Sequence, residues 1–152
     1  MTMPIPEWNE FGVLPSGIHD CAIDEIEQQL GFNDHRATLI RGLRRTLEWL
    51  ETMPPIESLI LDGSFVTDKA APSDIDAVAM IGNLTDRHQR DWIRTWQPQH
   101  WPLKDQNRVD LYPTAVGNGN NFSAYFQYIK PEEALERGAP LGLLKGLLRV
   151  RR

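Results

Sequence analysis

The stretch Gly63-Ser-Phe-Val-Thr-Asp-Lys-Ala-Ala-Pro-Ser-Asp-Ile-Asp76 decides the expected fold. It begins where an apolar run over residues 56–62 ends, and it leads into a second apolar run over residues 75–81. Each run has the length and composition of a buried strand. Because strand side chains alternate between faces, Asp74 and Asp76 are expected on the same face of the second strand. The sequence therefore predicts two strands, the second of which presents a pair of carboxylates.

The paired carboxylates indicate a metal site. Two carboxylates held a few ångströms apart repel each other unless a cation lies between them. Oxygen ligands suit Mg²⁺ or Mn²⁺, and Mg²⁺ usually binds together with the phosphates of a substrate. Gly63 lets the backbone approach a phosphate closely, and Ser64 offers a hydroxyl and an N–H to its oxygens. These residue types predict a nucleotide site.

Length and composition indicate one globular domain over residues 1–152. The hydrophobic fraction is 41% and the charged fraction 24%, as in soluble proteins. No apolar run approaches the roughly 20 residues of a membrane span, and we expect neither a secretory signal nor a membrane partner. Cys21 is the single cysteine, which excludes an internal disulfide and a cysteine-based zinc site. The expected location is cytoplasmic.

The net charge of −5 argues against a protein whose whole surface binds nucleic acid. The charge is uneven, which leaves a local basic patch open as an alternative. We interpret the arginines of residues 36–45 as a solvated helix face. The basic residues cluster in two segments: Arg36, Arg41, Arg44 and Arg45, and then Lys145, Arg149, Arg151 and Arg152.

Periodicity and breaker residues predict the remaining elements. Prolines and a Ser-Gly turn indicate that residues 1–18 form an extended arm on the surface. Helices are expected over Cys21–Leu30 after an Asp20 cap, from an Asn33 cap to about Thr52, over 86–96 after Thr85, and over 131–138.

The sequence predicts a third strand and two loops and leaves two segments open between helix and strand. A third strand is expected over 108–112, ended by Pro113, and a loop between Pro98 and Pro102. Residues 117–121 are expected in a turn or mobile loop, whereas 122–128 and 143–150 fit either helix or strand. We therefore expect an α/β (or α+β) domain in which a small mixed sheet carries the carboxylates on one face and helices pack on the other.

The two strands resemble the signature of the DNA polymerase β-like nucleotidyltransferase superfamily. The first strand ends in Gly63-Ser64 and the second carries Asp74-Ile-Asp76, with Asp110 as the third acidic residue. Three longer strings, at 14–19, 61–69 and 145–150, also resemble small bacterial nucleotidyltransferase-like proteins of unknown function.

The resemblance implies roles for these residues. Asp74 and Asp76 would hold Mg²⁺ (or Mn²⁺) bridging the nucleotide phosphates. Asp110 would complete the metal site and help to deprotonate the attacking hydroxyl. Gly63 and Ser64 would hold the β- and γ-phosphates.

One departure from the superfamily concerns the triphosphate. Stand-alone members often carry Arg-Gly shortly after Gly-Ser, where this chain has Thr67 and Asp68. A cation for the triphosphate must then come from elsewhere, and Lys69 is the candidate. Asp62 is expected to face away from the metal and cap the turn.

The leading hypothesis is a Mg²⁺-dependent nucleotidyltransferase that moves a nucleoside monophosphate from an NTP, expected to be ATP, to a hydroxyl of a protein or RNA. The alternative is a non-catalytic partner-binding protein with the same fold, belonging to a toxin–antitoxin or phage-defence pair. The missing Arg-Gly and the short chain motivate it.

A third hypothesis is RNA binding through tryptophans interleaved with arginines over 87–101. We prefer to interpret Trp92, Ile93 and Trp96 as the buried stripe of a helix. The histidines, including His100, show no metal-ligand spacing and are expected in surface or packing roles.

Overall fold

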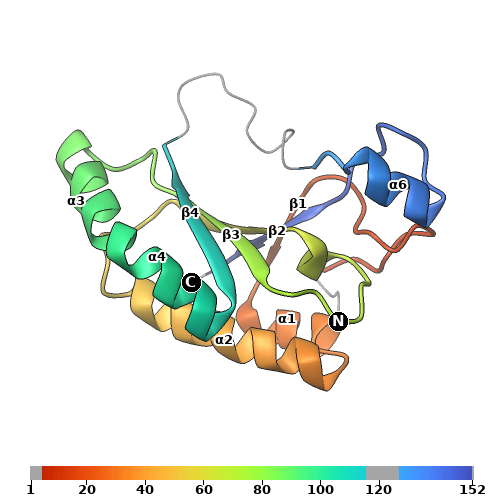
Figure 1. Ribbon diagram of the computed structural model, residues 1–152. Helices are drawn as coiled ribbons and strands as arrows, with labels where there is room; N and C mark the ends of the chain where they lie inside the picture. Colours follow the sequence, from red (N-terminus) through yellow and green to blue (C-terminus); the bar gives the residue numbers. More distant parts are fainter. Residues whose placement is uncertain (1–4, 116–126, 152) are drawn as a thin grey trace.

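A computed structural model describes residues 5–115 and 127–151. The strands of these residues form one five-stranded mixed sheet, and helices pack around it (Figure 1). The strand order is β1-β5-β2-β3-β4, with β1 parallel to β5, β3 parallel to β4, and antiparallel pairing elsewhere. The strands are β1 (Ile18–Cys21), β2 (Ser58–Asp62), β3 (Ile75–Met80), β4 (Val109–Thr114) and β5 (Leu147–Val150).

The first two helices of the chain, α1 and α2, lie along one side of this sheet (Figure 1). Asn33 caps α2 by accepting a hydrogen bond from the backbone of Arg36, and Thr85 caps α3 in the same way from His88. The helices are α1 (Ile23–Leu30), α2 (Asp34–Leu50), α3 (Asp86–Trp96), the short α4 (His100–Pro102) and α6 (Pro131–Arg137). Single turns are η1 (Ser64–Val66), η2 (Gln97–Gln99) and the π-helical η3 (Leu103–Asn107).

The alternation of strand side chains gives the two faces of the sheet different roles. Leu59 and Leu61 of β2 join the main core under α1 and α2. Ile60, between them, belongs to a separate small cluster with Val78 and Leu147 on the opposite face. Asp62 lies two residues after Ile60 on β2, and Asp76 lies two residues before Val78 on β3. Because strand side chains alternate between faces, both carboxylates lie on the same face as Ile60 and Val78. The fold class predicted from the sequence is therefore confirmed, with the carboxylates and the main helices on opposite faces.

Arg36 contradicts the interpretation of the α2 arginines as a solvated face. Its side chain is completely buried. The guanidinium donates hydrogen bonds to the carbonyl oxygens of Leu30, Phe65, Thr67 and Lys69. Helix α2 thus holds the segment that follows Gly63-Ser64 through one buried cation. Helical periodicity assigns Arg36 to the polar side of α2, together with the other arginines. Its burial follows only from contacts with segments distant in sequence.

The N-terminal arm packs partly into the core. Residues 5–17 contain no regular helix or strand, but Ile5, Val13 and Leu14 are buried. Asp20 does not cap a helix as predicted: it lies in β1 and pairs with Arg149 of β5, while Ala22 is the N-cap of α1. The tail, which fitted helix or strand, contributes β5 between β1 and β2.

Two other boundaries differ from expectation. The predicted loop between Pro98 and Pro102 is helical, as a chain of short turns from η2 to η3. Pro113 does not end β4 but pairs with Ala79, which is allowed because β4 is an edge strand. The predictions for 117–121 and most of 122–128 lie outside the described residues.

None of the helices in the described part of the chain has the length and hydropathy needed to cross a membrane.

Candidate functional site

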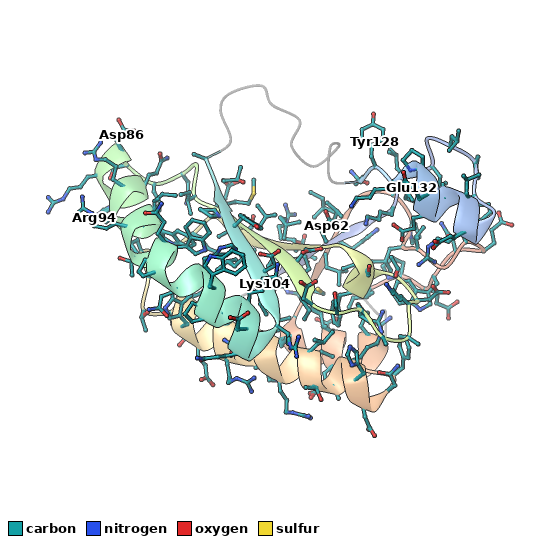
Figure 2. The ribbon with its side chains drawn as sticks, in the orientation of Figure 1. Asp62, Asp86, Arg94, Lys104, Tyr128 and Glu132 are labelled. Carbon is teal, nitrogen blue, oxygen red and sulfur yellow. The ribbon has the colours of Figure 1, made fainter. Side chains whose placement is uncertain are left out.

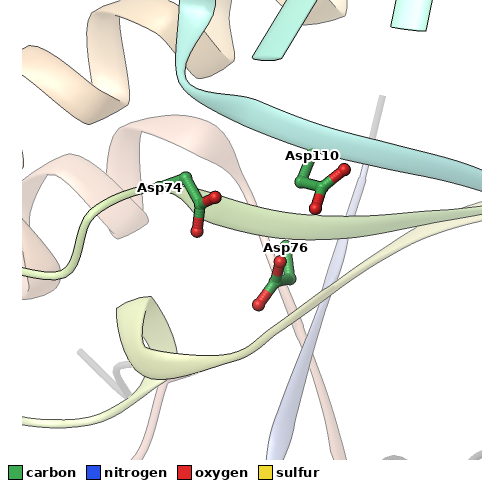
Figure 3. A group of neighbouring side chains, drawn as sticks. All are labelled: Asp74, Asp76 and Asp110. Atoms are coloured by element: carbon green, nitrogen blue, oxygen red, sulfur yellow. The ribbon is translucent and has the colours of Figure 1, made fainter. Parts of the chain in front are cut away.

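Three carboxylates converge on the face of the sheet opposite α1 and α2 (Figure 3). Asp74 immediately precedes β3, Asp76 lies within β3, and Asp110 lies on β4. Asp76 and Asp110 are register partners in the parallel pair, so their side chains project together. One oxygen from each of the three carboxylates lies within 4.8 Å of the others. The structure thus brings together the three acidic residues that the sequence selected.

Asp62 is a fourth carboxylate at this face, contrary to the expectation that it faces away. It is the antiparallel register partner of Asp76, which places both on the same side of the sheet. Its Oδ1 atom is buried and accepts no hydrogen bond within the described residues. Lys145 Nζ lies 3.4 Å from that oxygen. Pairing the two predicted strands in this antiparallel register would have placed Asp62 opposite Asp76.

Burial and the negative charge of the cluster raise the pKa of Asp76. Burial, and then the negative charges of Asp74, Asp110 and Asp62, raise the pKa of Asp76 from 3.8 to about 6, while Lys145 opposes them. A carboxylate with this environment is costly to ionise without a compensating cation. The site therefore favours either a proton or a positive ion next to Asp76.

Gly63 is required by the geometry of this cluster. Its φ of +78° lies in the left-handed region, where a side chain is strained. A Cβ at this position would lie 2.1 Å from Asp76 Oδ2. The glycine therefore makes room for a carboxylate, in addition to any approach of a phosphate. Ser64 follows it as the first residue of η1.

An open pocket of about 480 Å³ lies beside Gly63 and Ser64. Its walls include Asp76 and two lysines, Lys130 and Lys145. The Lys145 side chain is only 8% exposed, so its charge is partly desolvated. Sequence reasoning did not assign a role to either lysine, because both lie far along the chain from Gly63. A pocket of this size accommodates a small ligand.

Lys69, the predicted triphosphate cation, lines an adjacent pocket of about 520 Å³ with Ser64, Lys130 and Arg137. Its backbone oxygen is held by Arg36. The structure therefore places Lys69 near Ser64 but not along the wall that Asp76 lines.

The two residues that replace Arg-Gly are engaged within the chain. The Thr67 hydroxyl donates a hydrogen bond to the Ser64 backbone oxygen at 2.6 Å. Asp68 accepts one from Arg137 of α6 at 2.8 Å. These contacts make both positions structural here.

Asp110 has two basic partners that sequence reasoning missed. His100 Nε2 lies 3.0 Å from Asp110 Oδ1, and Lys104 Nζ lies 3.4 Å from Oδ2. The side chains of His100 and Asp110 are 12% and 13% exposed. An ionised carboxylate has about four lone-pair sites, so both oxygens can accept a further partner. His100 has no ligand spacing in the sequence, and only the turn from α4 into β4 brings it here.

The aromatic and basic segments separate into different environments. Trp92 is fully buried, which confirms the buried-stripe interpretation for that residue. Trp101, in contrast, is exposed. Among the C-terminal basic residues that the structure describes, Arg149 pairs with Asp20, Arg151 with Glu25 and Lys145 with Asp62.

The donor set fits a hard divalent cation. Asp74, Asp76 and Asp110 supply only carboxylate oxygens, the ligands that Mg²⁺ and Mn²⁺ prefer. The raised pKa of Asp76 indicates that its carboxylate lacks compensating positive charge, whereas the nearby Asp62 Oδ1 has Lys145 Nζ at 3.4 Å.

Residues 6–150 match a family described as "Family of unknown function (DUF6932)", and the chain belongs to that family. No match to the chain was found among curated proteins or solved structures. The matched range includes every residue of the carboxylate cluster, but it assigns no activity to them.

Proposed function

We propose that this member of the DUF6932 family is a Mg²⁺-dependent (or Mn²⁺-dependent) nucleotidyltransferase that transfers a nucleoside monophosphate from an NTP, ATP in the first instance, to a hydroxyl of a protein or RNA. The observation that carries the proposal is the convergence of Asp74, Asp76 and Asp110 within 4.8 Å beside Gly63-Ser64. This observation supports the proposal in two ways. The same residues carry the resemblance to polymerase β-like nucleotidyltransferases, and their carboxylate oxygens suit a metal ion that binds together with phosphates.

In this proposal the three aspartates hold the ion. When bound, the ion supplies charge neutralisation for a displacement at phosphorus. The acceptor hydroxyl oxygen attacks the α-phosphorus, the bond from that phosphorus to the α,β-bridging oxygen breaks, and pyrophosphate leaves. Asp110 accepts the hydroxyl proton. Its contacts with His100 and Lys104 orient the carboxylate before the substrate arrives.

The phosphates of the nucleotide would occupy the pocket beside Ser64. Lys130 and Lys145 line that pocket and can replace the arginine that this chain lacks. Lys145 also balances the charge of Asp62, so it is held in place before a phosphate binds. Lys69, in the adjacent pocket, would reach only the outer end of a phosphate chain.

The test is incubation of the protein with α-labelled ATP and Mg²⁺ in cell extract. Wild type should label a macromolecule, and Asp76→Asn should not. Asp105→Asn, which changes an exposed aspartate outside the cluster, is the matched control and should label as wild type does. Equal labelling by wild type and Asp76→Asn would remove the catalytic claim.

A second candidate is a non-catalytic protein that binds a cognate toxin or antitoxin, or a partner in phage defence. The internal contacts of Thr67 and Asp68 favour it, because positions that hold arginine and glycine in many active relatives of the superfamily serve the fold here. Calorimetry with Mg²⁺–ATP separates the two candidates. Absence of heat at millimolar nucleotide would leave the partner-binding protein.

The proposal also keeps the cytoplasm as the compartment. ATP and Mg²⁺ are abundant there, and the single cysteine, Cys21, is a buried free thiol.

A further inference from the structure

Aromatic side chains form a group immediately beside Asp110. Tyr112 follows Asp110 by two residues on β4 and therefore projects to the same face. The His100 ring centroid lies 4.9 Å from that of Tyr112 and 5.0 Å from that of Trp101. We call Trp101, His100 and Tyr112 the aromatic platform.

The platform is open to solvent at both ends. Trp101 is 62% exposed and Tyr112 is 48% exposed. Trp96 behind them is fixed differently, since it packs on His100 and donates its indole N–H to the Leu111 backbone oxygen. Trp101 and Tyr112 both pack on His100, and exposed aromatic side chains gathered in one patch mark interaction sites more often than rings scattered singly.

A cation accompanies the rings. Lys104 Nζ lies 5.5 Å from the Trp101 ring centroid as well as 3.4 Å from Asp110 Oδ2 (Figure 2 labels Lys104). Exposed aromatic rings with an adjacent lysine are the combination that binds single-stranded nucleic acid, through base stacking and phosphate contact.

The position of the platform separates it from the phosphate pocket. Asp76 lies on β3 between β2 and β4. The pocket with Ser64 and Lys145 lies on the β2 side of Asp76, and the platform lies on the β4 side. A nucleotide whose phosphates fill the pocket leaves the platform free for the acceptor, the molecule whose hydroxyl attacks the α-phosphorus.

We propose that the aromatic platform stacks the terminal base of a single-stranded nucleic acid, which places its terminal hydroxyl next to Asp110. This inference rests on the proposed function and names its acceptor class: the end of a single strand, in preference to a protein.

The direct test measures binding of a fluorescein-labelled single-stranded RNA of about eight nucleotides, in Mg²⁺, by fluorescence anisotropy. Trp101→Ala and Tyr112→Ala should each weaken binding by about 5- to 100-fold, and Trp101→Phe should retain most of it, because stacking needs a ring. Leu135→Ala, on exposed α6, is the matched control and should bind as wild type does.

Several results would overturn the inference. One is a wild type that binds no RNA, and another is equal affinity in wild type, Trp101→Ala and Tyr112→Ala. A third is a loss caused by Tyr128→Ala alone, which would place the base over the phosphate pocket. A fourth is a Trp101→Ala defect in binding ATP but not RNA, which would assign the platform to the nucleotide substrate.

The same variants distinguish this inference from the proposed function. The thermal shift caused by Mn²⁺ reports the carboxylates and should be the same in Trp101→Ala and wild type. A Mn²⁺ shift with no effect of the platform variants on RNA binding would reject the inference alone. Loss of RNA binding in Trp101→Ala without any Mn²⁺ shift in wild type would support the platform while rejecting the proposed function.

Discussion

Asp76 on β3 lies directly opposite Asp110 on β4, and both side chains project to the face of the sheet that α1 and α2 leave uncovered. Parallel pairing places like charges side by side, where they repel each other unless a proton or a cation intervenes. The fold therefore holds an arrangement that is unfavourable for the metal-free protein at neutral pH. Such an arrangement is typical of a binding site.

The first prediction concerns Asp76 and pH. Its pKa is raised to about 6 in the folded protein, so the folded state binds the proton more tightly than the unfolded chain. The corresponding stability is present below pH about 4 and is lost as the pH rises through about 6. In EDTA at pH 7.5, Asp76→Asn should therefore be more stable than wild type by about 1 to 3 kcal/mol.

Urea unfolding at several pH values checks this result. The difference between Asp76→Asn and wild type should shrink toward pH 4, and Asp105→Asn should show no such trend. A less stable Asp76→Asn at pH 7.5 in EDTA would mean that the ionised carboxylate stabilises the fold, which contradicts the prediction.

The second prediction concerns Gly63. Alanine there should lower the free energy of unfolding by about 2 kcal/mol or more, because of its positive φ and the 2.1 Å approach of Asp76 Oδ2. Gly138→Ala is the matched control, since Gly138 has a φ of +65° but no atom within 4 Å of the added methyl. It should cost only the backbone strain, about 1 kcal/mol.

Urea unfolding compares the two alanine variants. Gly63→Ala should also lose the thermal shift caused by Mn²⁺, because the methyl displaces Asp76. Equal costs at the two glycines, with the Mn²⁺ response intact, would show that Asp76 does not need the space beside Gly63.

The third prediction concerns Arg36. Its buried guanidinium satisfies four backbone carbonyls and lies 4.5 Å from the Phe32 ring centroid and 5.0 Å from that of Phe65. Lysine cannot reproduce the planar fork, so Arg36→Lys should lower the free energy of unfolding by about 3 kcal/mol or more. Arg41→Lys, exposed on the same helix, should cost less than about 0.5 kcal/mol. Similar costs in urea unfolding would contradict the anchoring role of Arg36.

The fourth prediction concerns Cys21. Burial is the main cause that raises the pKa of this thiol to about 12, so almost no thiolate exists at pH 8. Native protein should resist Ellman's reagent and react fully in urea. The single variant Ser73→Cys, which adds a second cysteine at an exposed position, should release one equivalent in the native state. Rapid reaction of native wild type would show that the β1–β5 edge opens readily.

Local patterns predicted much of the fold. The caps at Asn33 and Thr85 and the helix of α3 follow from short-range chemistry, and the structure has them as expected. The same holds for the three carboxylates, because strand alternation fixes the face of Asp76 and Asp110 once the two strands pair.

Contacts between distant segments were not predictable in this way. Arg36 is buried because the chain after Gly63 returns to α2, and Lys145 reaches Asp62 because β5 lies beside β2. His100 contacts Asp110 because the turns between α3 and β4 reverse the chain. Each of these residues looks like an ordinary surface polar residue when only its neighbours in sequence are considered.

The most direct test of the central claim is anomalous diffraction from crystals soaked with Mn²⁺ and a nonhydrolysable ATP analogue. We expect an anomalous peak bonded to oxygens of Asp74, Asp76 and Asp110, at about 2.0 to 2.2 Å, with the analogue's phosphates toward Ser64. A map with the analogue bound elsewhere, and no peak among the three carboxylates, would contradict it.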